Sequence, residues 1–340
     1  MRKKLFKFLN YFIFLLLGIF LLWLVTKDQD LNKLWEEIKQ ANYFWVLMSL
    51  VAGICSHLFR ALRWNLLLKS MGHPTKTITT FYAVMVGYFA NLAIPRLGEV
   101  ARCGAISRQN RIPLNEVFGT VVAERAFDMI VLLTIIAGVI VFQLKLLGGF
   151  MQKYLWEPLS QKFSSAGSMT LILILGVVGF FLICYILYRI LLPRLRKIPL
   201  FQKIMGLMKG FMEGIKSLWR MKQKLLFLLY TICIWFMYSM MNYLVFFALT
   251  GTTLLTFGDA ITLMALGSLG IVAPVPGGIG TYHAVVILVM TSLYHIAQQT
   301  ATTYAYVAHT SQVIMMVVVG ILSLMMLSFT APKKEINEQK

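Results

Sequence analysis

Two stretches of this 340-residue chain place charged side chains inside apolar sequence. In VVAERAFDMI, Glu124 and Asp128 lie four residues apart, so both carboxylates face one side of a helix, with Arg125 beside them. The stretch NLAIPRLGEVAR carries three more charges, Arg96, Glu99 and Arg102. Ionisable residues at membrane depth are costly, usually paired and functional by default. The arginines of such a set can hold a phosphate, and the acids can balance them or contact a cation.

Because the two stretches are consecutive elements, we expect Glu124 and Asp128 to pair with charges of NLAIPRLGEVAR. The alternative role of these charges is a structural ion-pair network that closes a helix bundle. A mixed site would combine the two roles.

Two apolar segments are interrupted, one by Pro95 and Gly98 and the other, APVPGGIGTYHA, by Pro274 and Pro276. Proline removes a backbone donor and disfavours helix in the residue before it. Backbone groups freed at membrane depth need partners, so irregular backbone is tolerated only inside protein or beside a wet cavity. Both breaks therefore predict a cavity.

The second break carries three glycines whose N–H groups can converge on an anion: Gly277, Gly278 and Gly280. A helix beginning near Thr281 would offer its positive end to the same anion. The simpler alternative is a tight turn between packed half-helices. His283 is a further candidate for substrate binding, although a packed, hydrogen-bonded imidazole is the commoner role.

Arg60 and Arg63, in HLFRALRWNLL, share a helical face near the predicted cytoplasmic end. They are candidates for headgroup contact, either by holding a lipid phosphate or by snorkelling to the headgroups, and we favour snorkelling. The motif DQD, from Asp28 to Asp30, has the outline of an acidic motif of membrane glycosyltransferases, but such a motif more commonly caps a helix. The sequence predicts no metal site and no cofactor.

The composition is that of an integral membrane protein. Hydrophobic residues make up 59% of the chain and charged residues 13%, and the mean hydropathy is +0.76. The net charge of +19 would suit a nucleic-acid partner. In a membrane chain, cytoplasmic loops rich in Lys and Arg explain it better, so we expect no nucleic-acid partner.

The elements that position the candidate residues are apolar segments of membrane length, about 20 residues as a helix. Six uninterrupted segments reach this length: 8–25, 43–62, 115–142, 170–192, 225–249 and 303–329. Two further apolar segments, 78–110 and 259–295, contain the breaks. The sequence thus predicts an all-α polytopic membrane protein with six full transmembrane helices and two re-entrant or broken helix hairpins.

Charge placement orients the chain, because cytoplasmic loops are rich in Lys and Arg. The basic segment 189–224 and the basic N-terminus are therefore cytoplasmic. The tail 333–340 is cytoplasmic as well if both interrupted segments dip into the membrane and return. They would then enter from opposite faces, as in an inverted-repeat transporter. We predict a single transmembrane domain over 1–332 with such a repeat and with both termini in the cytoplasm.

The stretches RALRWNLLL, GYFANLAIPRLGEVARCGAISRQNRIPLNEVFGTVVAERAFDMIVLL and PVPGGIGTYHAVV resemble the lysylphosphatidylglycerol synthase transmembrane-region family in order and spacing over nearly the whole chain. The family implies movement of a polar-headed lipid between leaflets, with the charges and breaks named above as its three signatures. His283 stands where the family often has a glutamate, which implies a different substrate charge. The short segment after residue 329 leaves no room for a soluble aminoacyl-transfer domain, so we expect flipping without synthesis.

We expect a lipid translocase of the bacterial inner membrane that is not an enzyme. It would move a polar-headed phospholipid or lipid-linked intermediate through a polar cavity at the two breaks, because charged headgroups cross hydrocarbon at high cost. The phosphate would be held by Arg96, Arg102 and Arg125. The arginines would be balanced, and a cationic headgroup contacted, by Glu99, Glu124 and Asp128.

Two other functions stay open. A membrane glycosyltransferase using a lipid-phosphate sugar would need Asp28 or Asp30 for catalysis. A non-transporting scaffold would recruit a separate lipid-modifying enzyme through the segment 189–224. A homo-oligomer also stays open.

Single cysteines introduced within 104–112 test the re-entrant path of the first interrupted segment. That path places 104–112 in the cytoplasm, since both flanks of the segment are basic. In a background without the native cysteines, a membrane-impermeant maleimide should therefore label these positions only after the cells are permeabilised. Labelling only from the outside of intact cells would refute the re-entrant path.

Overall fold

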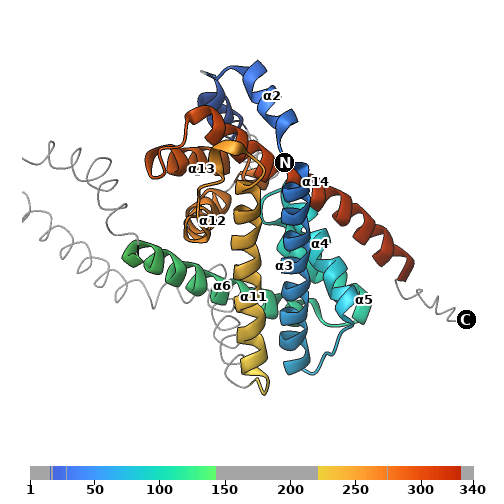
Figure 1. Cartoon of the computed structure of the whole chain (residues 1–340). Coiled ribbons are helices and arrows are strands. Elements are labelled where there is room, and N and C mark those ends of the chain that lie inside the picture. The colour runs from blue at the N-terminus through green and yellow to red at the C-terminus, as the bar shows by residue number, and fades with distance from the viewer. Residues whose placement is uncertain (1–15, 17, 28, 143–220, 274, 331–340) are drawn as a thin grey trace, which may run out of the picture. The chain divides into compact units, whose positions relative to one another are not determined.

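The computed structural model describes residues 16, 18–27, 29–142, 221–273 and 275–330. Within these ranges the regular elements are helices, and the described residues contain no strand. The chain divides into two compact units, one joining 1–139 to 217–340 and the other covering 140–216, which falls almost wholly outside the described ranges. The helices of the first unit are labelled in Figure 1. The all-α prediction is confirmed for the described residues.

Four of the described helices are long and apolar enough to cross a membrane: α3 (Tyr43–Ser70), α6 (Leu114–Phe142), α11 (Lys224–Phe246) and α14 (Gln298–Thr330). They coincide with four of the six predicted spans. Half of the predicted span 8–25 lies outside the described residues, and 170–192 lies entirely outside them. The number of six spans therefore stays a prediction, as does the cytoplasmic location of 189–224 and of both termini.

Each interrupted segment forms two shorter helices that pack against each other. The segment 78–110 forms α4 (Thr77–Ala93) and α5 (Leu97–Asn110). The segment 259–295 forms α12 (Phe257–Val272) and α13 (Thr281–Ser292). Both breaks are thus confirmed as helix interruptions, and the re-entrant path of each pair stays a prediction.

At the first break the backbone is extended and then left-handed. Ile94 has φ −137° and ψ 122°, the extended conformation that a following proline favours. Arg96 then adopts φ 66° and ψ 3°, and α5 begins at the next residue. The turn brings Gly98 so close to Gly87 of α4 that a Cβ at Gly98 would collide with the Gly87 carbonyl oxygen. Packing of the two helices therefore requires glycine at position 98.

The second break contains the short 3-10 turn η3 (Pro276–Gly278). Its glycines at 277, 278 and 280 have positive φ values of 60°, 71° and 82°, which glycine adopts without strain. Gly280 also lies against Gly18, in the helical stretch 18–26, where a Cβ at Gly280 would collide with the Gly18 carbonyl oxygen. Pro274, which was also predicted to end a helix here, falls outside the described residues.

The two breaks lie next to each other. A Cβ built at Gly277 would be 3.1 Å from Leu92 Cδ2, and Leu92 lies one residue before the end of α4. The turn η3 contacts α4 more widely as well. The described residues therefore meet one requirement of the predicted cavity, which is that the two interrupted segments approach each other at their breaks.

Both halves of the described chain repeat one order of helix lengths, which is long, short, short, long. In the first half α3, α4, α5 and α6 have 28, 17, 14 and 29 residues. In the second half α11, α12, α13 and α14 have 23, 16, 12 and 33 residues. This order fits the predicted internal repeat, and the inverted orientation of the halves stays a prediction.

The helix α2 (Leu31–Gln40) is capped at its N-terminus and is hydrogen-bonded to α14 near its C-terminus. The Asp30 carboxylate accepts hydrogen bonds from the backbone N–H groups two and three residues later, at 3.0 and 3.2 Å. Thr303 of α14 donates a hydrogen bond to Glu37 at 2.5 Å. The helix-capping role that the sequence favours for the DQD motif is confirmed for Asp30. Asp28 lies outside the described residues.

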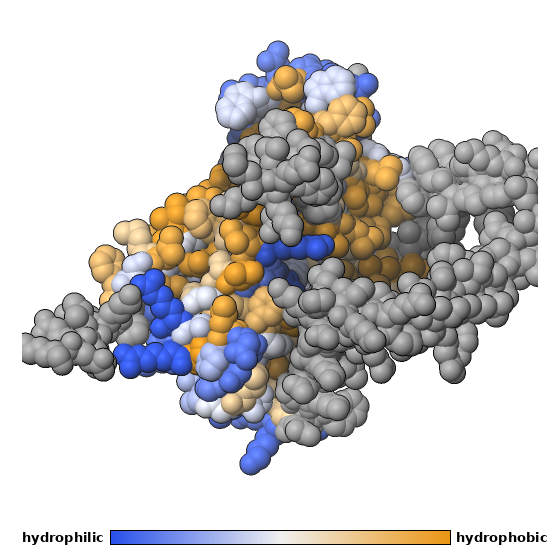
Figure 2. Space-filling view, turned by 180° about the vertical axis from the view of Figure 1, so that it is seen from behind, coloured by the Kyte–Doolittle hydropathy of each residue, from blue (hydrophilic) through white to orange (hydrophobic). Residues whose placement is uncertain are grey.

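The helix α3 is central to this unit, because it packs against α4, α11 and α14. In Figure 2 apolar side chains cover much of the middle of the described surface, where one hydrophilic group interrupts them, and other hydrophilic side chains gather toward its upper and lower ends. Helices surrounded by lipid are expected to present such an apolar band. Five of the charged residues discussed below are nevertheless buried inside this unit: Arg60, Arg63, Arg102, Glu124 and Asp128.

The contact at Gly98 predicts a selective effect of one added methyl group. Gly98→Ala places a Cβ against the Gly87 carbonyl oxygen, and overpacking of this kind costs about 1–3 kcal/mol. We expect a lower thermal unfolding temperature in detergent, measured by circular dichroism. Gly104→Ala on the same helix is the matched control, because nothing lies within 4 Å of the position of its Cβ. An equal loss in both variants would contradict the assigned contact.

Candidate functional site

A buried carboxylate, Glu124 of α6, is the centre of a charge cluster. It is 0% exposed. Its Oε1 accepts hydrogen bonds from Arg60 Nη1 at 2.6 Å and from Arg63 Nη2 at 3.2 Å. Its Oε2 lies 3.1 Å from Arg102 Nη1. One carboxylate therefore faces three guanidinium groups, two from α3 and one from α5.

Asp128, one helical turn further along α6, completes the cluster. Its carboxylate oxygens lie 2.8 Å from Arg60 Nη1 and 2.7 Å from Arg63 Nη1. The arrangement follows from helical spacing, because the two arginines are three residues apart on α3 and the two acids four apart on α6. Each pair thus presents one charged face, and the two faces meet. Pairing is essential here, since an isolated buried charge is far more costly than a paired one.

The structure corrects the prediction that Arg60 and Arg63 extend to the lipid headgroups. The two residues are 3% and 0% exposed. An arginine snorkels to keep its charged head solvated, and here α6 supplies two carboxylates instead. Helix α11 holds the same side chains from another direction: Arg60 Nη2 donates to the Tyr238 hydroxyl at 3.1 Å, and Arg63 Nη1 donates to Thr231 Oγ1 at 3.2 Å.

The three charges of the first break lie in three different environments. Arg102 is 3% exposed, pairs with the central carboxylate of α6 as expected, and lies over the Trp64 ring with 4.8 Å from Cζ to the ring centroid. Glu99 Oε1 lies 2.8 Å from Arg125 Nη2. Arg96 is exposed and forms no ion pair among the described residues, so its predicted contact with the acids of α6 is not observed.

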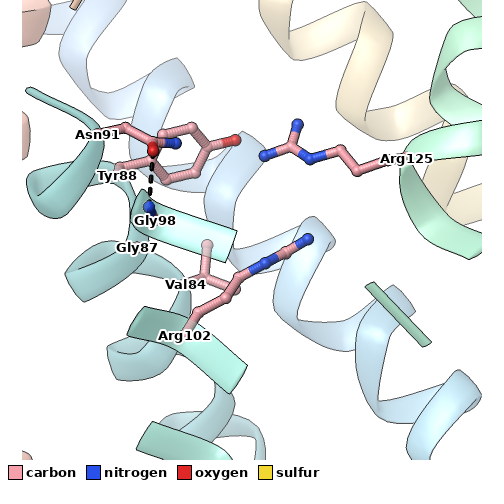
Figure 3. A pocket seen from close by; sticks show the side chains of 7 residues that line it. All are labelled: Val84, Gly87, Tyr88, Asn91, Gly98, Arg102 and Arg125. Atoms are coloured by element: carbon pink, nitrogen blue, oxygen red, sulfur yellow. Dashed lines mark hydrogen bonds between the residues drawn. The ribbon is translucent and has the colours of Figure 1, made fainter. Parts of the chain in front are cut away.

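A small open pocket adjoins the cluster. The space in it and at its opening, which is shared with open solvent, is about 200 Å³. The pocket is lined by residues of α4, α5 and α6: Val84, Gly87, Tyr88, Asn91, Gly98, Arg102 and Arg125. In Figure 3 the guanidinium groups of Arg102 and Arg125 and the hydroxyl group of Tyr88 point into the same space. The Gly98 N–H donates a hydrogen bond to Asn91 Oδ1 at 2.7 Å, which holds the first turn of α5 against α4.

The pocket has unused hydrogen-bond donors and a local excess of positive charge. Within the described residues, Arg102 Nε and Nη2 are buried and have no hydrogen-bond partner, whereas most buried polar atoms in proteins have one. Across the cluster and the pocket, four arginines face three carboxylates, which leaves one positive charge in excess. A singly charged anion would supply both the missing acceptor and the missing charge.

Tyr88 and Asn91 are pocket residues that the sequence analysis did not single out. They lie three residues apart on α4, so both side chains emerge on the same face immediately before the break. The hydroxyl groups of Tyr88 and Tyr238 lie 3.1 Å apart, which connects the pocket to the hydrogen-bond network of Arg60. A pair of polar side chains at helical spacing in the apolar second half of α4 was the signal available in the sequence.

None of the second-break glycines lines this pocket: Gly277, Gly278 and Gly280. The Gly278 N–H donates to the Val275 carbonyl at 3.1 Å, inside the turn itself. The Gly277 carbonyl accepts a hydrogen bond from His309 Nε2 at 2.9 Å. The tight-turn alternative therefore describes these glycines better than the predicted anion cradle.

His283 is packed among aromatic rings away from the pocket. It is 3% exposed, and its ring centroid lies 4.9 Å from that of Tyr306 and 4.8 Å from that of His309. This arrangement fits the commoner role of a packed imidazole. Among the described residues, no group of three or more His, Cys, Asp or Glu side chains is placed to hold a metal ion.

Comparison of the sequence with known proteins identifies the family of this chain. The model of the lysylphosphatidylglycerol synthase TM region matches residues 11–320. The chain belongs to this family. A stretch of 106 residues is 27% identical to a UPF0104 membrane protein of Methanocaldococcus jannaschii, covering 30% of this chain and 32% of that protein, so the match spans about a third of the relative's length. No solved structure matches the chain.

Family membership and the four membrane-capable helices together identify a multi-pass membrane protein. The matched range includes every residue of the charge cluster and of the pocket. It also includes both breaks.

Glu124→Gln removes the charge that three arginines share. Removing one partner of a buried ion pair is strongly destabilising, by about 3–5 kcal/mol, because the remaining charges stay buried and uncompensated. We expect a loss of this order in unfolding free energy, measured by chemical denaturation in detergent micelles. Glu116→Gln is the control, because that carboxylate contacts His73 at 2.7 Å but is 38% exposed, where a pair contributes less than about 1 kcal/mol. A Glu124→Gln variant as stable as the control would contradict the network.

Proposed function

We propose that the protein moves a polar-headed phospholipid between the two leaflets of the membrane, with the lipid phosphate bound in the pocket beside the first break. The observation that carries this proposal is the guanidinium group of Arg102. It is buried, lines the pocket together with Arg125, and keeps two nitrogen atoms without a hydrogen-bond partner among the described residues. Phosphate oxygens are the acceptors that arginine binds best.

A translocase must lower the cost of carrying a charged headgroup through hydrocarbon. In the described residues, arginine, tyrosine and asparagine side chains provide polar contacts inside an apolar bundle, while the lipid tails would stay in the bilayer. The pocket is small, so the phosphate would lie at its opening, where the partly exposed guanidinium group of Arg125 can reach it. No covalent bond is made or broken in such a step.

The residues of the cluster then have two separate roles. Arg102 and Arg125 contact the phosphate, and Tyr88 contributes a hydroxyl group beside them. Glu124 and Asp128 lie behind them and hold the buried arginines in place. Membership of the lysylphosphatidylglycerol synthase TM region family supports a function in lipid metabolism or transport.

A membrane glycosyltransferase receives less support from the described residues. It would use Asp28 or Asp30 as a catalytic or metal-binding carboxylate. The Asp30 carboxylate is engaged by two backbone N–H groups at the start of α2. The scaffold function predicts lipid binding without lipid movement, and the experiment below separates it from transport.

Arg125→Gln should slow lipid exchange strongly while preserving the fold. Its side chain is 42% exposed and pairs with one acid, so its loss leaves the buried cluster intact. Losing a charge-assisted contact to the phosphate should slow exchange about tenfold or more. The measurement is the exchange of headgroup-labelled phospholipids between leaflets of vesicles that contain the purified protein.

Arg108→Gln is the matched control, because Arg108 is an exposed arginine of the last turn of α5 and does not line the pocket. Its exchange rate should equal that of the parent. Exchange that persists at the parent rate in Arg125→Gln would exclude the pocket as the route. Binding without exchange in the parent would favour the scaffold function.

A further inference from the structure

We propose that Arg96 is a second phosphate site, which lies on the lipid-facing side of the first break and holds a phospholipid of the leaflet on the side of α2. Arg96 was expected from the sequence to share one phosphate with Arg102 and Arg125, but it does not line the pocket that contains them. Binding of a lipid at Arg96 is independent of transport. The role of this binding in moving the lipid rests on the proposed function.

The side chains next to Arg96 in the chain are apolar and exposed. Ile94, Leu97 and Val100 are 49%, 38% and 51% exposed, and the arginine itself is exposed. In a bundle that spans a membrane, such side chains contact lipid. An arginine among them is costly unless its charged end reaches water or an anionic headgroup. The first break therefore presents a positive charge to the surrounding bilayer.

The guanidinium group of Arg96 forms no ion pair among the described residues, whereas each of the four arginines of the cluster and the pocket faces a carboxylate. Glu99, the acid nearest to Arg96 in the sequence, lies against Arg125 instead. The anion that a charge facing the bilayer meets is a lipid phosphate. Arginine binds phosphate oxygens through several N–H groups at once, which makes this the natural partner of the unpaired charge.

Contacts between helices give the depth of the first break. At the start of α4, Thr77 Oγ1 accepts a hydrogen bond from Asn65 Nδ2 at 3.1 Å. Nearer its end, the ring centroid of Tyr88 lies 4.3 Å from that of His57. The helix α4 therefore runs antiparallel to α3 and ends toward Tyr43, where α3 begins beside α2. With a rise of about 1.5 Å per residue, the break lies about 12 Å inside that end of α3.

This depth allows the arginine to reach a phosphate of one leaflet. The helix α3 has 28 residues, so its length of about 42 Å exceeds the hydrocarbon core by about 12 Å. With equal projections at both ends, the break lies about 6 Å below the core surface on the α2 side. The side chain can extend toward the headgroups, or a phosphate can be drawn inward to meet it. In both cases the bound group is a phosphate of this leaflet.

The pocket lies deeper along the same pair of helices. Gly87 and Gly98 line it, and Gly87 precedes the end of α4 by six residues, which is about 9 Å. A phosphate released by Arg102 and Arg125 thus meets Arg96 as the next positive charge toward the α2 side. The crossing is divided into shorter steps, so the phosphate spends less of the path without a counter-charge.

The left-handed backbone of Arg96 suggests a variant that removes the charge and keeps the turn. Its φ is 66°, and asparagine adopts this conformation more readily than most residues. Arg96→Asn therefore removes the charge with little strain, whereas Arg96→Lys retains it. Arg111→Asn is the matched control, because Arg111 is an exposed arginine with φ 56° at the other end of α5.

The site is tested by photolabelling of the full-length protein in vesicles of phosphatidylethanolamine and phosphatidylglycerol. The probes are a phosphatidylglycerol with a diazirine close to its glycerol backbone and a diacylglycerol with the same diazirine and no phosphate. Mass spectrometry locates the adducts. In the parent, the phospholipid should label residues 93–100 about tenfold more than the diacylglycerol does. Arg96→Asn should lose this excess, and Arg96→Lys and Arg111→Asn should keep it.

Two results would overturn the phosphate site, namely equal labelling by both probes in the parent and an undiminished excess in Arg96→Asn. Inorganic phosphate is added at the concentration of the vesicle lipid to distinguish a lipid phosphate from free phosphate. Loss of the excess on this addition would overturn the assignment to a lipid, and a persistent excess would support it.

Leaflet exchange of headgroup-labelled phospholipids in the same vesicles separates this inference from the proposed function. Arg96→Asn should slow exchange about tenfold, and Arg125→Gln should slow it while the labelling of 93–100 persists. Labelling that depends on the phosphate, in a parent that exchanges no lipid, would support the site and reject the translocase. Exchange that is slowed in Arg125→Gln and unchanged in Arg96→Asn would support the translocase and overturn the role of Arg96 in transport.

Discussion

The fold around the site depends on one constraint, which is that charges buried in an apolar bundle must be paired. Glu124 is fully buried and faces guanidinium groups from α3 and α5, and Arg60 and Arg63 extend the network to α11. A buried ion pair adds little net stability over apolar packing, but leaving one partner unpaired is strongly unfavourable. The network therefore penalises any rotation or sliding of these helices that separates the charges. The network thus fixes the alignment of α3, α5, α6 and α11, and it adds little to the stability of the fold.

This alignment creates the pocket as a consequence. Arg102 is anchored by Glu124 at one nitrogen and by the Trp64 ring below it, which leaves its other nitrogens facing the pocket. Arg125 stands next to Glu124 in sequence but leaves α6 in another direction, toward Glu99. These consecutive residues of α6 thus differ in their surroundings. Glu124 is a buried counter-ion, and Arg125 forms a partly exposed ion pair.

Much of the architecture could be predicted from the sequence, because hydropathy and proline placement act locally. Four described spans, both breaks, the shared face of Glu124 and Asp128 and the pairing of Arg102 with α6 follow from such local rules. The partners of Arg60 and Arg63 could not be predicted, since they depend on how α3 and α6 rotate toward each other across 60 or more intervening residues. The role of the second-break glycines could not be decided from the sequence, because one pattern serves both anion binding and close backbone packing.

The two breaks differ in backbone geometry and in chemistry. The first carries arginines and acids, while the second is closed by glycine contacts and by a hydrogen bond from His309 to the Gly277 carbonyl. Gly277 also packs on Leu92, one residue after Asn91, whose side chain holds the first turn of α5. The second break therefore supports the end of the helix that supplies Tyr88 and Asn91 to the pocket. Changes at the second break can therefore reach the pocket through Leu92 without touching any charged residue.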